Sequence, residues 1–85
     1  MGDAMIYIYS NLKRIRNYLK LSQNAFANLL ELNVSNISRW ENKKNGMSLD
    51  TALIISEKLN IPLPELIAKD LNDDDISIYI NRIKK

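Results

Sequence analysis

The feature that most constrains the fold of this chain is a series of short apolar repeats at helical spacing. Leu12, Ile15 and Leu19 recur at intervals of three and four residues after Ser10, a residue type that often precedes a helix. Similar repeats follow along the chain, and polar or turn-forming residues separate them. In a chain of 85 residues, this pattern predicts one all-α domain of short helices around a modest core.

Six helices are expected from the capping residues and the apolar spacing. Their expected bounds are 10–20, 23–30, 34–41 or 42, 48–59, a short helix flanked by Pro62 and Pro64, and a last helix that begins at 73–75 and ends in Arg82, Lys84 and Lys85. The expected caps are Ser10, Ser22, Asn33, Ser48 and Asn60, and Gly46 is expected to take a positive φ. The residues expected to face the core are Leu12, Ile15, Leu19, Phe26, Ala27, Leu30, Ile37, Trp40, Leu49, Ala52, Leu53, Ile55, Leu59, Leu63, Leu66 and Ile67, and the last helix carries one apolar stripe of Ile76, Tyr79, Ile80 and Ile83.

The chain is expected to have three parts. Residues 1–9 form an N-terminal arm or a tag-derived segment, in which the stretch Met5–Tyr9 is either strand-like or an extension of the first helix. Residues 10–69 form the five-helix domain, and residues 70–85 form an additional C-terminal helix. That helix either packs back on the domain or serves as a dimerisation element.

Composition excludes several classes of function. The chain contains neither cysteine nor histidine. Without cysteine it can form no disulfide and no thiolate metal site, and without histidine it lacks the commonest general base. Phosphate-binding glycine loops, paired catalytic carboxylates and metal-ligand spacings are also missing from the sequence, so no enzyme activity, cofactor or metal is expected. The run Asp73–Asp75 is interpreted as a helix start rather than a cation site.

No apolar run approaches the roughly 20 residues that span a bilayer, and no signal-peptide pattern opens the sequence. A cytoplasmic protein without a membrane partner is therefore expected.

Charge is unevenly distributed along the chain. Between Ser10 and Asn45 there are seven basic and two acidic residues, a net charge of +5, whereas the remainder carries five basic and eight acidic residues. Scattered solvated charge would explain this equally well. The separation of the chain into a basic and an acidic part nevertheless favours the interpretation that one face of the protein binds a polyanion.

The expected second and third helices have the arrangement of a helix-turn-helix that reads DNA. They are short, a tight turn separates them, and a polar loop follows. The second helix of such a pair lies in the major groove, so its outward residues must be small or hydrogen-bonding. Here the outward positions are Asn33, Val34, Ser35, Asn36, Ser38 and Arg39. Ile37 and Trp40 lie on the opposite face of that helix.

This stretch resembles the Xre, or Cro/phage-repressor, family of transcription regulators. The residues that carry the likeness are Leu21, Ser22, Gln23, Phe26, Ala27, Leu30, Leu32 and the run Ile37–Asn42. The likeness extends from about Leu12 to Ile67 and implies a five-helix lambda-repressor-like DNA-binding domain. Two positions depart from the family pattern: Glu31 stands in the turn where the family usually has glycine, which risks backbone strain, and Lys43 replaces a glycine after the recognition helix.

The resemblance implies roles for individual residues. It implies contacts with DNA bases for Val34, Ser35 and Arg39, and contacts with the DNA backbone for Gln23, Asn36, Asn42, Lys43 and Lys44. It also implies a structural ion pair between Arg16 and Glu41, since family members pair an arginine of the first helix with the glutamate that ends the recognition helix.

The function implied by the resemblance is sequence-specific binding of double-stranded DNA by a homodimer on a palindromic operator. Leu29 and Ile54 are apolar where relatives are usually polar, and the stripe Ile76–Ile83 and the segment Ile6–Tyr9 add apolar surface, which favours a dimer interface built from the fourth to sixth helices. The alternative is an antitoxin-type or other protein-interaction module that uses the same fold and binds a protein partner through the C-terminal helix.

Overall fold

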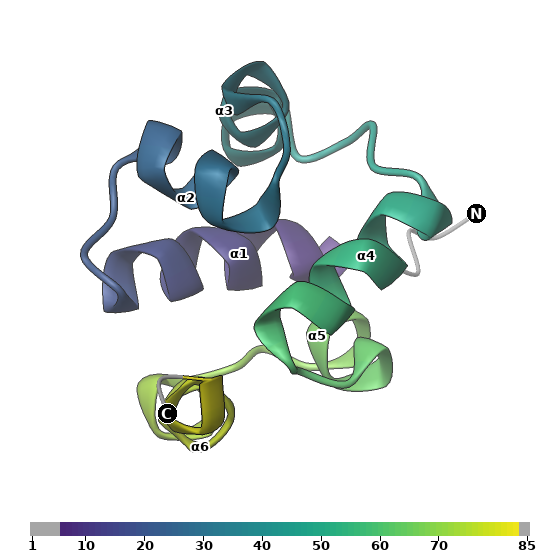
Figure 1. Ribbon diagram of the computed structural model, residues 1–85. Helices are drawn as coiled ribbons and strands as arrows, with labels where there is room; N and C mark the ends of the chain where they lie inside the picture. Colours follow the sequence, from purple (N-terminus) through teal and green to yellow (C-terminus); the bar gives the residue numbers. More distant parts are fainter. Residues whose placement is uncertain (1–5, 84–85) are drawn as a thin grey trace.

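The part of the chain that the structure describes folds into six helices joined by short loops (Figure 1). The computed structural model describes the backbone of residues 6–83 and the side chains of residues 7–80. The helices are α1 (Ile6–Tyr18), α2 (Gln23–Leu30), α3 (Val34–Lys43), α4 (Leu49–Leu59), α5 (Leu63–Ala68) and α6 (Asp73–Ile83). No strand occurs within residues 6–83. The prediction of an all-α fold with six helices is therefore confirmed.

Local capping explains where several of these helices begin. The Ser22 hydroxyl accepts a hydrogen bond from the backbone N–H of Ala25 at 3.0 Å, and Ser48 caps α4 in the same way. Asn72 caps α6: its side chain accepts from the Asp75 N–H, while the Asp75 carboxylate accepts from the Asn72 N–H. This reciprocal pair is a capping box, and it explains one carboxylate of the acidic run as a helix start.

The N-terminal segment differs from the expected arm. α1 begins at Ile6, so the stretch up to Tyr9 is an extension of the first helix and the expected boundary at residue 9 falls inside α1. Ser10 lies within the helix, where its hydroxyl donates to the Tyr7 carbonyl, and is not the N-cap. Ile8 and Tyr9 are buried, and the Tyr9 hydroxyl accepts a hydrogen bond from the Met47 N–H. The helical conformation of this turn places Ile8 and Tyr9 in the core, and their burial stabilises it. Residues 1–5, part of the segment expected to be an arm or tag-derived, lie outside the described residues.

The core lies around α1, which packs against α3, α5 and α6, while α2 packs against α3 and α4 (Figure 1). The buried apolar residues are Ile8, Tyr9, Leu12, Ile15, Phe26, Ala27, Leu30, Ile37, Trp40, Met47, Ala52, Ile55, Leu59, Ile61, Leu66, Leu71, Ile76 and Ile80. Most of the expected core positions are among them. Leu19, Leu63, Ile67 and Tyr79 pack at the edge of this core, and the Ile83 side chain lies outside the described residues.

Two core predictions on α4 are wrong. Leu49 and Leu53 are 61% and 48% exposed, because α4 buries the face that carries Ala52, Ile55 and Leu59. Leu49 and Leu53 lie four residues apart on a different side of the helix. The sequence pattern did not distinguish these two faces, since both are apolar.

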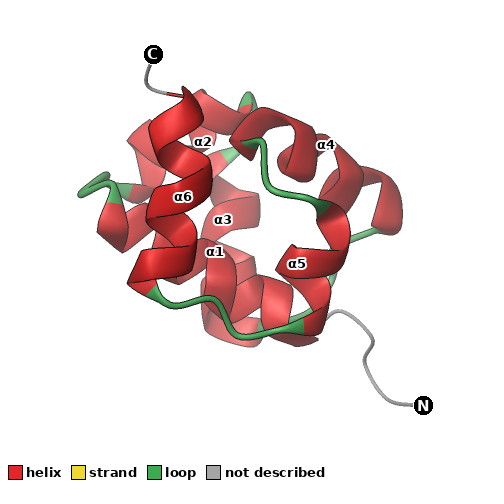
Figure 2. Cartoon of the chain, turned by 90° about the horizontal axis from the view of Figure 1, so that it is seen from below, coloured by secondary structure: helices red, strands yellow, loops and turns green. Residues whose placement is uncertain are grey.

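The sixth helix packs back on the domain. Ile76 is fully buried and Ile80 is 2% exposed, and α6 contacts both α1 and α4 (Figure 2). The favoured interpretation, a dimer interface that included this stripe, is therefore wrong for Ile76 and Ile80, which the chain's own core covers. Ile78, on another side of α6, is 54% exposed.

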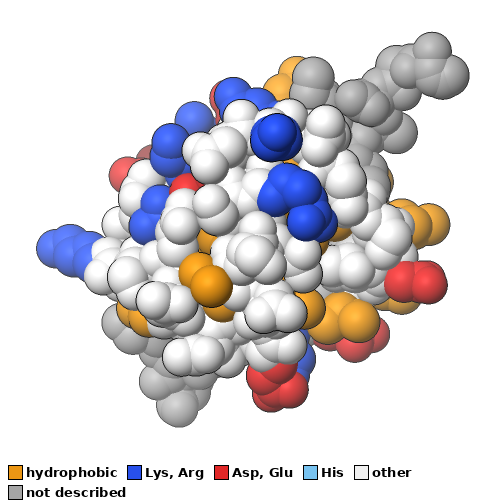
Figure 3. Space-filling model, turned by 90° about the horizontal axis from the view of Figure 1, so that it is seen from above, with side chains coloured by type: hydrophobic (Ala, Val, Ile, Leu, Met, Phe, Trp, Pro, Cys, Tyr) orange, Lys and Arg blue, Asp and Glu red, His pale blue; other side chains and the backbone are white. Residues whose placement is uncertain are grey.

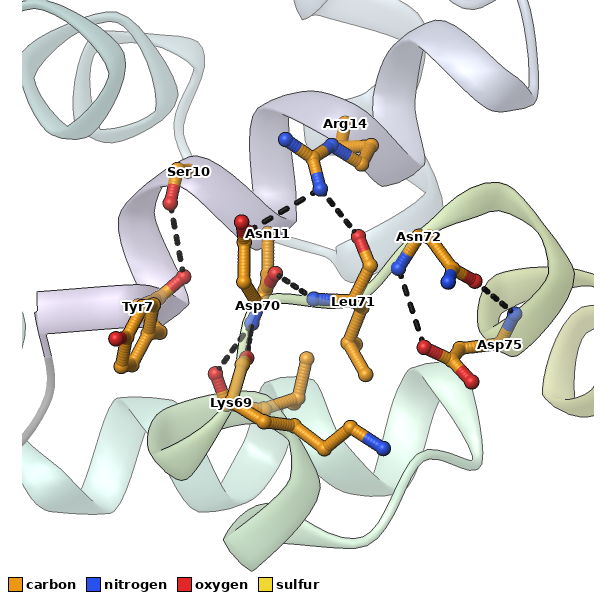
Figure 4. Close-up of polar contacts among 10 residues, drawn as sticks. Tyr7, Ser10, Asn11, Arg14, Lys69, Asp70, Leu71, Asn72 and Asp75 are labelled. Atoms are coloured by element: carbon orange, nitrogen blue, oxygen red, sulfur yellow. Dashed lines mark hydrogen bonds and ion pairs between the residues drawn. The ribbon is translucent and has the colours of Figure 1, made fainter.

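A buried asparagine fastens the α5–α6 connection to α1 (Figure 4). The Asn11 amide is fully buried; it donates to the carbonyls of Leu66 at 2.7 Å and Lys69 at 2.8 Å, and accepts from the Leu71 N–H at 2.9 Å. Arg14, one turn further along α1, donates to the Leu71 carbonyl and pairs with Asp70. No sequence pattern points to Asn11, because its partners lie 55 to 60 residues away.

Among residues 6–83, four residues other than glycine have left-handed backbone conformations: Lys20, Glu31, Lys44 and Asn60. Glu31 has φ 60° and ends α2, so the strain expected at this position is real. Lys43, by contrast, is helical, and the positive φ after α3 falls on Lys44. The expected left-handed cap at Asn60 and positive φ at Gly46 are confirmed.

The strain at Glu31 gives a testable prediction. Glu31→Gly is expected to melt about 4 °C or more above Glu31→Ala, because only glycine adopts this backbone conformation at no steric cost. Both variants lose the ion pair between Glu31 and Lys58 (2.8 Å), so the difference between them isolates the backbone contribution. Thermal unfolding followed by circular dichroism measures it, and equal melting temperatures would show that the position is unstrained.

Candidate nucleic-acid interface

Helix α3 is held from one side and exposed on the other. Ile37 and Trp40 are buried at 2% and 3% exposure, whereas Ser35 and Arg39 are exposed. The turn between α2 and α3 is closed by the Leu32 N–H, which donates to the Ala27 carbonyl at 2.8 Å. The polar face of α3 is therefore open to a partner, as a recognition helix requires.

Positive charge surrounds this face. Figure 3 views the molecule from the side on which α3 lies in Figure 1, and Lys and Arg side chains gather there while most Asp and Glu side chains lie toward the rim. Lys43 and Lys44, at the end of α3, are exposed. The charge distribution of the sequence thus corresponds to a surface that can attract a polyanion.

The three residues expected to touch bases differ in exposure. Ser35 and Arg39 are exposed, but Val34 is half-buried and packs against the core. The Arg39 guanidinium donates from Nη2 to Oδ1 of Asn36 at 3.0 Å. Arg39 is thus both open to solvent and held by a neighbour one turn away.

The residues expected to hold the DNA backbone form two groups. Asn42, Lys43 and Lys44 are exposed at the C-terminal end of α3, where Asn42 donates to the Ser38 hydroxyl at 3.3 Å. Gln23 lies at the start of α2, is half-buried, and donates from Nε2 to Oε1 of Glu41 at 3.0 Å.

Arg16 and Glu41 form a two-point ion pair, as expected from the resemblance. Arg16 Nε lies 2.7 Å from Glu41 Oε2, and Nη2 lies 2.9 Å from Oε1. Arg16 also donates from Nη1 to the Leu21 carbonyl at 2.9 Å, at the end of the α1–α2 turn. The two side chains are 15% and 6% exposed. The pair therefore joins α1, the start of α2 and the end of α3 beneath the exposed face.

The surroundings of Glu41 favour its ionised form. Burial by itself raises the pKa of Glu41, but hydrogen bonds from Arg16 and Gln23 and the charges of Arg16 and Lys13 more than reverse this effect, so the pKa lies below its ordinary value. The hydrogen bond from Arg16 to Glu41 outweighs burial in the same way and raises the pKa of Arg16.

This lowered pKa predicts a pH dependence of stability. A carboxylate with a lowered pKa in the folded state stabilises the fold above its ordinary pKa, and the stabilisation is lost as the pH falls through the lowered value. The difference in free energy of unfolding between wild type and Glu41→Gln is therefore expected to be constant near pH 7 and to shrink below about pH 4.5. Urea unfolding from pH 7 to pH 3 measures it. A difference that stays constant over that range would contradict the assignment of Glu41 as the titrating group.

Two structural features of this region were missed from the sequence. A Cβ placed on Gly46 would lie 3.2 Å from Arg39 Nε, so the α3–α4 loop passes close against the guanidinium. The Trp40 indole N–H is buried and has no hydrogen-bond partner among the described residues. The glycine at position 46 could have indicated the first feature, because glycine permits close approach of a side chain to the backbone as well as a positive φ.

Other kinds of site find no support in the part of the chain that the structure describes. No group of three or more acidic side chains there is arranged to hold a metal ion. None of the described helices is long and apolar enough to cross a membrane.

Comparison with known proteins bears on the same segment. Residues 12–66 match the family profile described as Helix-turn-helix, of the Cro/C1 or Xre-like type. The match covers more than half of the chain and includes α2, α3 and the Arg16–Glu41 pair. No curated protein and no solved structure matches the chain.

Proposed function

The chain belongs to the Cro/C1-type helix-turn-helix family, a DNA-binding and non-enzymatic family, and from that premise we propose that it is a sequence-specific transcription regulator. In this proposal α3 enters the major groove of double-stranded DNA. The observation that carries it is the exposure of Ser35 and Arg39 on a helix that Ile37 and Trp40 anchor from behind.

The proposed contacts divide by chemistry. The Arg39 guanidinium suits O6 and N7 of a guanine, Ser35 suits a base edge, and Val34 offers a methyl surface to thymine. Gln23, Asn42, Lys43 and Lys44 are proposed to hold phosphates, which sets the position of the protein on DNA without reading its sequence. The first-turn amides of α2, of which the Ser22 hydroxyl caps only that of Ala25, favour a phosphate at the same place.

This division predicts different results for two substitutions. Arg39→Ala is expected to lose about 1–3 kcal/mol of discrimination at one base pair, because a guanine contact is lost. Lys44→Ala is expected to weaken binding to all sequences alike and to reduce the salt dependence by about one phosphate contact. Selection of duplexes from a random pool, followed by titration of single-base variants, distinguishes the two. Equal loss for every duplex with Arg39→Ala would contradict base reading by Arg39.

A homodimer on a palindromic operator is proposed because one recognition helix reads only part of a turn, and half-sites about 34–36 Å apart double the contacts. Leu49, Leu53 and Ile54 are exposed on α4, which supports a dimer interface on that helix. The buried residues Ile76 and Ile80 of α6 are not part of this proposed interface. If each subunit makes four or five phosphate contacts, the log–log salt slope is expected to be roughly −7 to −9.

Two measurements test the dimer. An inverted repeat among the selected duplexes, together with a dimer in sedimentation at tens of micromolar, would support it. A single half-site and a monomer throughout would overturn it while leaving DNA binding intact.

The second candidate function is a protein-interaction module of the antitoxin kind, supported by the exposure of Ile78 on α6. Such a module has no need for an exposed Arg39 beside Lys43 and Lys44. Selection of duplexes discriminates the two functions, since a module that has lost DNA binding recovers no sequence.

A further inference from the structure

We infer that Asn36 and Gly46 are positioning residues for Arg39: they hold its guanidinium in the orientation in which it reads a base. This inference rests on the proposed function, because it concerns how the recognition helix obtains its sequence preference. It differs from the expectation that Asn36 holds a phosphate, and it gives Gly46 a role beyond its backbone conformation.

The first contact comes from α3 itself. Asn36 and Arg39 lie three residues apart and therefore share one face of the helix. Nη2 of Arg39 donates to Oδ1 of Asn36 at 3.0 Å. This hydrogen bond engages the amide oxygen of Asn36, and the other donors of the guanidinium remain for a ligand. Asn36 is half-buried, whereas Arg39 is exposed, so the anchor is the less mobile partner.

The second contact comes from the α3–α4 loop. A Cβ on Gly46 would lie 3.2 Å from Arg39 Nε, 3.8 Å from Nη2 and 3.9 Å from Cζ. All three are guanidinium atoms, so the guanidinium lies on the side of Gly46 toward which a Cβ would project. Gly46 also has φ +91°, which side-chain-bearing residues rarely adopt. A Cβ here would be closer to Nε than most Cβ contacts are, so the guanidinium would have to shift by a few tenths of an ångström.

Together these contacts restrict a long side chain that is otherwise free in water. An arginine loses much rotamer freedom when it makes a two-point contact with a base, and a side chain that is already oriented loses less. The exposed surface of Arg39 is thus presented in a fixed direction.

The experiment uses the wild-type chain, the best duplex recovered from a random pool, and the three duplexes that differ from it only at the base pair read by Arg39. Asn36→Ala is expected to reduce the preference at that base pair about fivefold or more, the size expected for residues in contact. The double variant Asn36→Ala, Arg39→Ala is expected to show the same preference as Arg39→Ala alone. Asn36→Asp keeps an acceptor for Nη2 and is expected to retain the preference, with weaker binding to all four duplexes because of its charge.

Asn42→Ala serves as the matched contrast on the same helix, since Asn42 bonds Ser38 and not Arg39. This substitution is expected to weaken binding to all four duplexes equally. Gly46→Ala tests the second contact and is expected to reduce the preference at the same base pair as Asn36→Ala. A structural effect of that strained backbone would lower the melting temperature but would not single out one base pair.

The outcomes separate this inference from the proposed function. If Asn36→Ala weakens all four duplexes equally, Asn36 acts as a phosphate ligand and the inference is overturned, while the proposed function stands. If wild type selects an operator but Arg39→Ala changes no base preference, the inference fails together with base reading by Arg39, while sequence-specific DNA binding stands. If wild type selects no sequence at all, both fail.

Discussion

Replacing Asn11 by alanine is expected to lower the free energy of unfolding by about 3–6 kcal/mol, a large share of the roughly 5–15 kcal/mol that stabilises a domain. The Asn11 amide satisfies two carbonyls and one N–H in a place without solvent access. Alanine leaves the buried Leu66 carbonyl and Leu71 N–H without a partner, each at a cost of about 1–3 kcal/mol, and removes the partner of the part-buried Lys69 carbonyl. The melting temperature is therefore expected to fall by at least about 12 °C.

Asn17→Ala is the matched control, because Asn17 is an exposed asparagine on the same helix. Its effect is expected to stay within about 0.5 kcal/mol. Asn11→Asp is expected to be at least as damaging as Asn11→Ala, because a carboxylate oxygen would then face the carbonyls of Leu66 and Lys69. An Asn11→Ala variant that melts with wild type would show that the α5–α6 connection does not depend on this side chain.

Replacing Glu41 by alanine is expected to cost about 3–5 kcal/mol, the usual consequence of removing one partner of a buried ion pair. Arg16, only 15% exposed, would keep its charge without the two-point carboxylate partner, and Gln23 would lose its acceptor as well. Because Glu41 lies beneath the exposed face rather than on it, the folded fraction of the variant is expected to keep the base preference of wild type. Chemical denaturation and duplex titration below the melting temperature measure the two effects separately.

The control is Glu57→Ala, which removes an exposed glutamate from α4 and is expected to have little effect on stability. The double variant Arg16→Ala, Glu41→Ala is expected to be less destabilised than the sum of the two single variants, because it leaves no unpaired charge. An unchanged melting curve for Glu41→Ala would refute a structural role for the pair.

The sequence predicted the helix-turn-helix well because its determinants are local. Ser22 caps α2 through an amide three residues away, and Ile37 and Trp40 define the buried side of α3 by their spacing alone. The outward position of Ser35 and Arg39 follows from the same spacing. The Arg16–Glu41 pair, 25 residues apart, was available only through the family resemblance, since no local pattern connects the two residues.

Two errors have a common origin. Leu49 and Leu53 were expected in the core, and the stripe of α6 was expected in an interface, because apolar spacing identifies an apolar face without identifying what covers it. On α4 two faces are apolar, and only one of them meets α2, α5 and α6.

The sequence by itself determined the number and type of helices, most of their ends and the polar face of α3. These depend on caps and spacings within one or two turns, where the chain's own geometry brings the residues together. Only the tertiary structure decided which face of α4 is buried, that α6 packs back on α1, and that Asn11 joins residues 55 to 60 positions away. Such contacts depend on how the helices are arranged in space, and the hydrogen-bonding capacity of an asparagine does not reveal which distant backbone groups will meet it.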